Sequence, residues 1–255
     1  MAAATETNPA HLVYVLRIAD SSLILGQRLS EWCGHGPVIE EDIALANVAL
    51  DLLGQARLLL SHAATLGGER DEDELAFGRD QHEFRNVSIV ELPNGHFGRT
   101  VLRNFLFTSF QRELWQALVG SSDTALAAIA AKSSKETRYH VQHAADWTVR
   151  LGDGTEESHQ RMQQALEELW PYTAEFFAAT GDDAALVAAG IGPDWSNLRT
   201  GWEAAVAPVL EVATLTVPAA TPFLSAGKAG RHTEHLGHVL AEMQFLQRAY
   251  PGSRW

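Results

Sequence analysis

A long amphipathic helix with a polar centre is the feature that most constrains this chain. The apolar side chains of residues 126–151 recur at steps of three and four residues, at Leu126, Ile129, Ala130, Ala144, Trp147 and Leu151. These steps describe one stripe of an α-helix. Continuing them inward places four polar residues on the same stripe, Ser133, Glu136, Thr137 and His140. A carboxylate and an imidazole inside an apolar seam are typical of a helical bundle that holds metal between its helices, and equally of a bundle that lacks the metal.

The rest of the chain is also predicted to be helical. Long helices are expected over residues 9–32, 39–67, 96–119 and 126–151, separated by glycine- and proline-containing turns. Further helices are expected after Thr155, with a kink at Pro171, over residues 194–214, and over residues 232–250. No linker or change in composition divides the chain. We therefore predict one all-α domain over residues 1–255, a four-helix bundle of long helices with additional C-terminal helices.

Composition excludes several classes of partner and compartment. An apolar fraction of 46% with 20% charged residues is ordinary for a globular protein. The formal net charge of −13 argues against nucleic acid and anionic membranes as partners, because both need a basic surface. The longest apolar runs are too short for a membrane span, and no export signal is apparent. With Cys33 as the single cysteine, we expect a cytoplasmic protein without disulfides.

The first two long helices can be compared with the ligands of a di-iron bundle. In such a bundle, two helices each supply a carboxylate and the other two each supply Glu-x-x-His. Asp20 lies inside the apolar stripe of the first helix and is an acceptable carboxylate. On the second helix, Asp51 has Gly54 three residues later, where histidine is required. The second helix therefore lacks its nitrogen ligand.

The third and fourth long helices depart from the pattern as well. Thr108 occupies the centre of the third stripe, with no acid at that level. Glu136 on the fourth helix is followed by Tyr139 at the histidine position, and His140 is one residue further on. We interpret these positions as a buried polar network in which the carboxylates pair with Arg112, Lys132, Gln55 and His140, since buried charge must be paired. A functional metal site built from an unusual ligand set remains the alternative.

Three further patterns could carry function. His232, His235 and His238 recur every three residues at the start of the last helix and predict a partner interface, with a metal site as the alternative. Residues 227–231, a short basic loop with two glycines, could hold an anion such as a phosphate group, or be solvated. Glu156 and His159 match Glu-x-x-His, but they follow a glycine-rich break and are interpreted as part of a helix N-terminus.

Five segments together resemble a known family. They are LRIADSSLILGQRLSEWCGHGP (16–37), EDIALANVALDLLGQARLLL (41–60), ELAFGRD (74–80), KETRYHVQHAADW (135–147) and RHTEHLGHVLAEMQFLQRAYPG (231–252). The chain is similar over nearly its whole length to the structural, non-catalytic subunits of bacterial phenylacetyl-CoA 1,2-epoxidase, a ring-hydroxylating monooxygenase.

This resemblance implies a ferritin-like fold and a scaffold role without a cofactor in this chain. The expected partners are a homologous catalytic subunit that carries the di-iron centre, a small accessory subunit and a flavin/iron–sulfur reductase. The implied reaction is epoxidation of the aromatic ring of phenylacetyl-CoA with O2 and electrons from NADPH, in aerobic phenylacetate degradation. Two other interpretations stay open: an autonomous ferritin-like oxidase that uses Asp20, Asp51, Glu136 and His140, and a free helical binding module.

Overall fold

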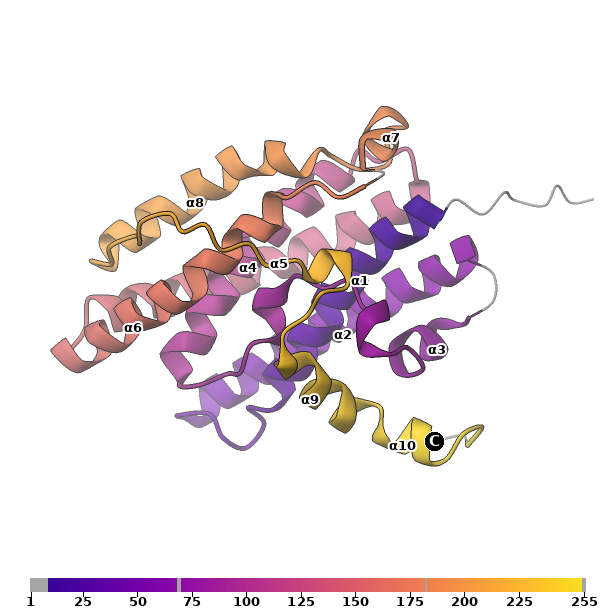
Figure 1. The fold of residues 1–255 in the computed structure, drawn as a ribbon. Helices are drawn as coiled ribbons and strands as arrows, with labels where there is room; N and C mark the ends of the chain where they lie inside the picture. Colours follow the sequence, from indigo (N-terminus) through magenta and orange to yellow (C-terminus); the bar gives the residue numbers. More distant parts are fainter. Residues whose placement is uncertain (1–8, 68–69, 182, 254–255) are drawn as a thin grey trace, which may run out of the picture.

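The computed structural model describes residues 9–67, 70–181 and 183–253, and four long helices form its centre (Figure 1). They are α1 (Pro9–Ser30), α2 (Ile39–Gly67), α4 (Phe97–Leu118) and α5 (Thr124–Gly152). α1 packs along α2, α4 packs along α5, and α2 also contacts α5. No β-strand occurs within these described ranges. The predicted all-α, ferritin-like helical bundle is confirmed.

Local chemistry explains how the turn between α1 and α2 forms. The carboxylate of Asp42, in the first turn of α2, accepts the backbone N–H groups of Gly34 (2.8 Å) and Gly36 (3.0 Å). A Cβ at residue 36 would lie 2.7 Å from the Cα of Asp42. Glycine is therefore required there, because the chain passes directly against the start of α2.

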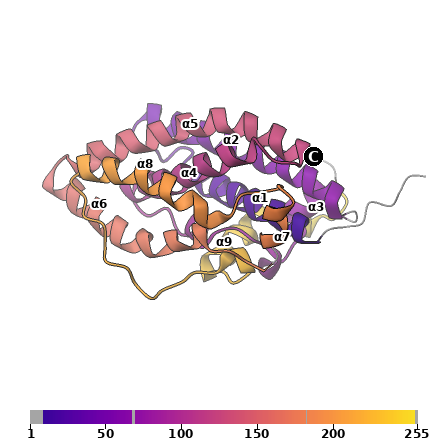
Figure 2. The same ribbon diagram turned by 90° about the horizontal axis from the view of Figure 1, so that it is seen from above.

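α4 is buried along most of its length, whereas α5 buries one stripe. α6 (Glu156–Leu169) and α8 (Leu198–Val212) both pack against α4, and both also contact α5. Figure 2 shows α8 lying beside α4 and α5. The indole of Trp202 in α8 donates to the carbonyl of Leu106 in α4 at 2.9 Å, so the two helices are joined by a hydrogen bond as well as by packing.

The region around Pro171 differs from the prediction of one kinked helix. α6 ends at Leu169, and a 3₁₀ segment, η3 (Trp170–Phe177), follows it directly. Proline lacks an N–H group and its ring collides with the carbonyl four residues earlier, so the α-helical pattern stops at this point. The tighter segment buries Phe176 and Phe177 against α4 and α8.

Shorter elements connect the long helices. α3 (Glu72–Phe77) begins at Asp71 with a capping box to Glu74. The remaining short elements are η1 (Gln81–Glu83), η2 (Ser88–Glu91), α7 (Asp183–Ala188), η4 (Trp195–Asn197) and η5 (Gly227–Ala229).

The last predicted helix is divided in two. α9 (Glu234–Met243) and α10 (Phe245–Ala249) are separated at Gln244, whose amide donates to the carbonyl of Arg79 at 2.9 Å. The contact holds the break against the segment that follows α3. In Figure 1 the two helices extend away from the bundle, and Phe245 and Tyr250 are exposed there.

α2 combines a buried face with an apolar outer face. By length and composition alone it would be apolar enough to cross a membrane, with a mean hydropathy of 1.5 over its most apolar window. The short apolar runs in the sequence did not indicate that α2 is this hydrophobic. A core helix of a globular protein passes the same test, and α2 packs along α1.

Candidate functional site

Asp20 lies in the interior but does not face the other predicted ligands. Its carboxylate is fully buried and forms a two-pronged ion pair with the Arg79 guanidinium, with Nη1 at 2.9 Å from Oδ2. The backbone N–H of Arg85 donates to the same oxygen at 2.8 Å. Asp20 therefore anchors the segment after α3 to the middle of α1, and both of its oxygens already accept hydrogen bonds.

The other predicted acids meet between α2 and α5. The imidazole of His140 is 2.9 Å from the Asp51 carboxylate. Glu136 accepts from the Gln55 amide at 3.1 Å and from the Lys132 ammonium at 2.8 Å. Burial lowers the pKa of His140, against the opposing effect of the Asp51 hydrogen bond. His140 is thus held as a neutral hydrogen-bonding group at neutral pH.

The predicted network is therefore only partly correct. Gln55, Lys132 and His140 do pair with the acids of α2 and α5. Arg112 instead contacts the neighbouring Glu113 at 2.9 Å, and Asp20 takes Arg79 as its partner. The network is also less buried than expected, because the side chain of Asp51 is 41% exposed.

Tyr139 does not occupy an interior ligand position. The buried residues of α5 include Ser133, Thr137 and His140. At about 100° per residue, the centre of the buried set lies about 95° round the helix from Glu136, on the His140 side. Tyr139 lies on the opposite side of Glu136 and is 60% exposed. The prediction that Tyr139 replaces an inward-facing histidine is wrong, because a step of three residues turns away from the core at this point.

Gly54 and Thr108 differ in where they lie. Gly54 is on the outer side of α2, and a Cβ added to it would meet nothing within 4 Å, so the residue does not mark an interior ligand position. Thr108 is fully buried at the centre of α4, as predicted. Its hydroxyl donates to the carbonyl of Asn104 at 2.7 Å, one turn earlier in the same helix.

These residues do not fit a di-iron centre. Asp20 is neutralised by Arg79, and none of its contacts within the described part of the chain involves Asp51, Glu136 or His140. Those residues do not form a group of three ligand atoms close enough to share one ion. Six oxygen and nitrogen ligands that converge from four helices are what two irons require. The interior instead offers hydrogen-bonded pairs.

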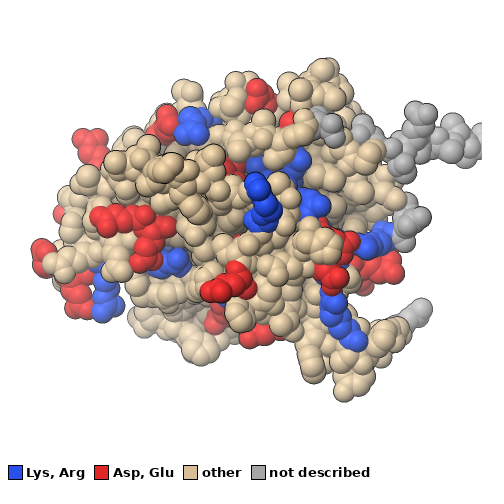
Figure 3. Space-filling view, in the orientation of Figure 1, with Lys and Arg blue, Asp and Glu red and all other residues tan. Residues whose placement is uncertain are grey.

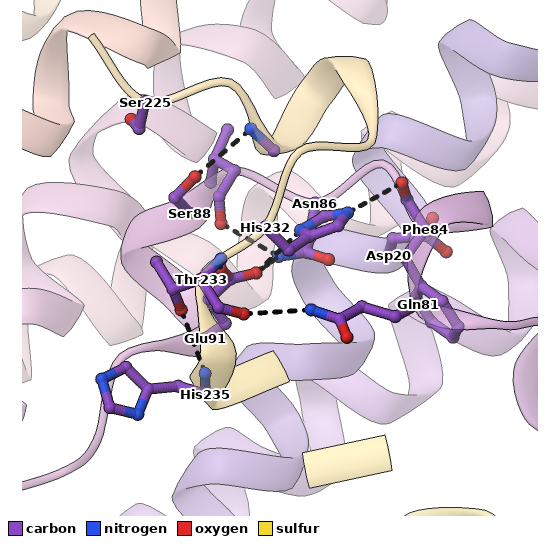
Figure 4. A network of polar contacts seen from close by, with 12 residues as sticks. Asp20, Gln81, Phe84, Asn86, Ser88, Glu91, Ser225, His232, Thr233 and His235 are labelled. Carbon is purple, nitrogen blue, oxygen red and sulfur yellow. Dashed lines mark hydrogen bonds and ion pairs between the residues drawn. The ribbon is translucent and has the colours of Figure 1, made fainter. Parts of the chain in front are cut away.

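His232, at the start of the C-terminal segment, is turned into the protein (Figure 4). Its Nδ1 lies 2.9 Å from the Glu91 carboxylate and its Nε2 3.0 Å from the carbonyl of Phe84. Because both ring nitrogens are engaged, the predicted interface role is wrong for His232. The ring of His235 points away from this network in Figure 4, and His238 is exposed. An interface role stays a prediction for those two residues.

Two buried acids that the sequence patterns did not reveal hold the C-terminal segment. Glu91 accepts from the Asn86 amide at 2.8 Å and from the backbone N–H of Thr233. Glu175 accepts from the backbone N–H groups of Ser88 and Lys228, both at 2.9 Å. Each acid joins the segment around η2 to the segment around η5, so their role is in the assembly of the fold. They lie in short 3₁₀ elements, which have no long periodic pattern to expose them.

The basic loop at residues 227–231 does not present Lys228 to an anion. The side chain is buried, and its ammonium donates to the carbonyls of Phe176 (3.2 Å) and Ala178 (2.6 Å) above the Trp195 ring. Burial lowers the pKa of Lys228 to about 7. Neither expected role, phosphate binding or a solvated loop, agrees with this position. The lysine side chain is instead part of the protein interior.

His159 also has a local role. Its Nδ1 lies 2.8 Å from the carbonyl of Gly152 and 3.2 Å from the hydroxyl of Thr214. It therefore ties the beginning of α6 to the end of α5 and to the residues after α8. Glu156 lies in the first turn of α6, where an acid is favoured by the helix dipole.

A His232→Gln variant should lose stability in a pH-dependent manner. Burial acts to lower the pKa of His232, but the hydrogen bond and charge of Glu91 outweigh it and raise the pKa above its usual value. The stabilisation is therefore fully present below the unfolded-state pKa of about 6.5 and is lost as the pH rises through the folded-state pKa. Denaturant unfolding should show a loss of about 1–3 kcal/mol at acidic pH that narrows in alkali. A His235→Gln chain is the control, and an equal loss at every pH would contradict the assignment.

The outer face of α2 carries exposed apolar side chains, which we call the α2 apolar surface. It consists of Ile39, Ile43, Leu50 and Leu58, and Leu50 is 65% exposed. Gly54 lies between Leu50 and Leu58 on this surface, with open space in front of it. Apolar residues gathered in this way are typical of a site for a protein partner.

The geometry describes a helical bundle of the ferritin-like class with no converging set of metal ligands at its centre, among the described residues, and with an apolar outer face. A family model described as phenylacetic acid catabolic protein matches residues 1–255. The chain is 52% identical over 242 residues to the C component of the 1,2-phenylacetyl-CoA epoxidase of Escherichia coli (strain K12), covering 95% of this chain and 98% of the relative. The chain belongs to the phenylacetic acid catabolic protein family, and the resemblance found in the sequence is confirmed.

Proposed function

We propose that this chain is the non-catalytic scaffold subunit of a phenylacetyl-CoA epoxidase. The observation that carries the proposal is the 52% identity to one component of such an epoxidase along nearly the whole of both chains. The interior supports it, because Asp20 is paired with Arg79 and His140 with Asp51. In this role the chain positions a homologous subunit that carries the di-iron centre, and takes no part in oxygen chemistry itself.

The α2 apolar surface is the proposed contact with that catalytic subunit. Ile39, Ile43 and Leu50 lie within about 40° of one another round the helix and are more than half exposed. A glycine in the middle of a helix lowers the stability of that helix. It is used there when another backbone must approach closely. Gly54, beside Leu50 and with no neighbour within 4 Å, would admit a partner helix.

The remaining partners follow from the same proposal. A small accessory subunit and a flavin/iron–sulfur reductase would complete the enzyme and supply electrons from NADPH, in the cytoplasm. Nucleic acid and membranes are not proposed as partners. On the face in Figure 3, acidic and basic side chains are interspersed and no extended basic area forms among the residues drawn in colour, and the net charge is −13. Phosphate-rich surfaces are repelled by such a protein.

Co-expression tests the proposal. Phenylacetyl-CoA epoxidation by the homologous di-iron subunit, with its reductase, should require this chain. All iron in the purified complex should be bound to the catalytic subunit and none to this chain. The autonomous-oxidase alternative requires iron in the isolated chain that is lost in Asp51→Asn and His140→Asn variants. Such iron, or full epoxidase activity without this chain, would overturn the scaffold role. A free binding module would form no complex with a di-iron subunit.

A further inference from the structure

Three metal-ligating side chains meet at one end of the bundle, away from its centre. His11 comes from the beginning of α1, His62 from the last turns of α2, and Asp123 from the residue that caps α5. Oδ2 of Asp123 lies 2.6 Å from Nε2 of His62 and 2.9 Å from Nε2 of His11. The three ligand atoms all lie within 4.8 Å of one another, and three separate helices supply them.

The two oxygens of Asp123 have different functions. Oδ1 accepts the backbone N–H groups of Ala125 and Leu126, both at 3.0 Å, and so caps α5. This leaves Oδ2 to face the two imidazoles. A carboxylate oxygen that is not needed for the cap therefore lies between two imidazole nitrogens.

The geometry agrees with a small divalent ion that prefers nitrogen and oxygen. Zn²⁺ binds imidazole and carboxylate ligands at about 2.0–2.2 Å, so that ligand atoms in a tetrahedral site lie about 3.3 Å apart. The two distances from the Asp123 oxygen, 2.6 and 2.9 Å, differ from that separation by less than about 1 Å, and no two of the three ligand atoms are more than 4.8 Å apart. The three side chains are 10–12% exposed, which leaves a path for the ion and for a water molecule as the fourth ligand.

Thr65 is placed to support the required form of His62. Its hydroxyl donates to the carbonyl of His62 at 2.6 Å, and the same oxygen lies 3.5 Å from Nδ1 of the ring. A metal on Nε2 requires a neutral ring with its proton on Nδ1, and that proton can be accepted by Thr65. When the metal binds, each imidazole loses the Nε2 proton that points at Asp123. That proton moves to Nδ1 of the same ring or to solvent.

We propose that His11, His62 and Asp123 bind one divalent transition-metal ion of the Zn²⁺ type, which clamps the ends of α1, α2 and α5 together. His62 is eleven residues beyond Asp51 on α2, a separation of about 16 Å along the helix axis. The site is therefore distinct from the bundle centre. It does not depend on the proposed function, because it stabilises the bundle whatever the partner.

The test is metal titration of the full chain, prepared without a histidine tag and treated with a chelator. Calorimetry with ZnCl2 should show one saturable site per chain, and CoCl2 should give the visible absorption of a tetrahedral ion. The Tm should rise by about 5–10 °C when free Zn²⁺ is about a hundredfold above Kd. Binding should weaken as the pH falls, since ligands must lose their protons.

Variants assign the ion to this site. Asp123→Asn keeps a capping side chain but removes the carboxylate, and should weaken Zn²⁺ binding by at least about tenfold, as should His62→Gln and His11→Gln. His238→Ala is the control for an exposed histidine, and Asp51→Asn with His140→Asn is the control for the bundle centre; these should bind normally. The absence of a saturable site in the wild-type chain, or unchanged binding in all three ligand variants, overturns the proposal and leaves a hydrogen-bonded cluster only.

Discussion

An Asp20→Ala chain should be about 3–5 kcal/mol less stable to unfolding than the wild type, because it leaves the buried Arg79 guanidinium without its counter-charge. Asp20 is fully buried and Arg79 is 2% exposed. Water therefore cannot replace the missing carboxylate, and the backbone N–H of Arg85 loses its acceptor as well. Denaturant-induced unfolding followed by circular dichroism measures the difference.

A matched pair of variants separates burial from charge. Asp51→Ala removes the hydrogen-bond acceptor of the neutral His140 ring from a position that is 41% exposed, and should cost about 0.5–1.5 kcal/mol. A double variant, Asp20→Leu with Arg79→Met, removes both buried charges and should recover most of the lost stability. A loss in Asp20→Ala no larger than in Asp51→Ala would show that the buried pair does not control the stability of α1.

An Ile43→Glu, Leu50→Glu double variant should lose the complex with the catalytic subunit. Both side chains are more than half exposed, so the free energy of unfolding should change by less than about 1 kcal/mol. Burying two carboxylates against an apolar partner should weaken association by at least about 30-fold, the effect of losing an interface hot spot. Co-purification and size-exclusion chromatography measure the association.

Val212→Glu is the control for this experiment, because Val212 is an exposed apolar residue at the end of α8. It adds one of the same charges on a different helix and should leave the complex intact. Equal association of the double variant and the wild type would place the contact elsewhere. The exposed residues of α9 and α10 would then be the next surface to test, including His235 and His238.

The burial of a side chain in the candidate site was predictable where the periodicity of its own helix determines it. Ser133, Thr137 and His140 repeat at the steps that face the core, and all three are buried. Tyr139 was misplaced because a ligand pattern with a step of three was applied at the edge of the buried stripe. Glu91 and Glu175 could not be found this way, since each lies in a short 3₁₀ element and draws its partners from distant segments.

The amino-acid sequence by itself determined the helical class, the four long helices and the family. Apolar periodicity, caps and turn glycines act over only a few residues, so they can be recognised without the fold. Tertiary structure decided which acids are paired and which faces are open. Asp20 meets Arg79 across 59 residues, and Asp123 meets His62 across 61. Such contacts depend on how whole helices pack against each other, and no local pattern encodes that.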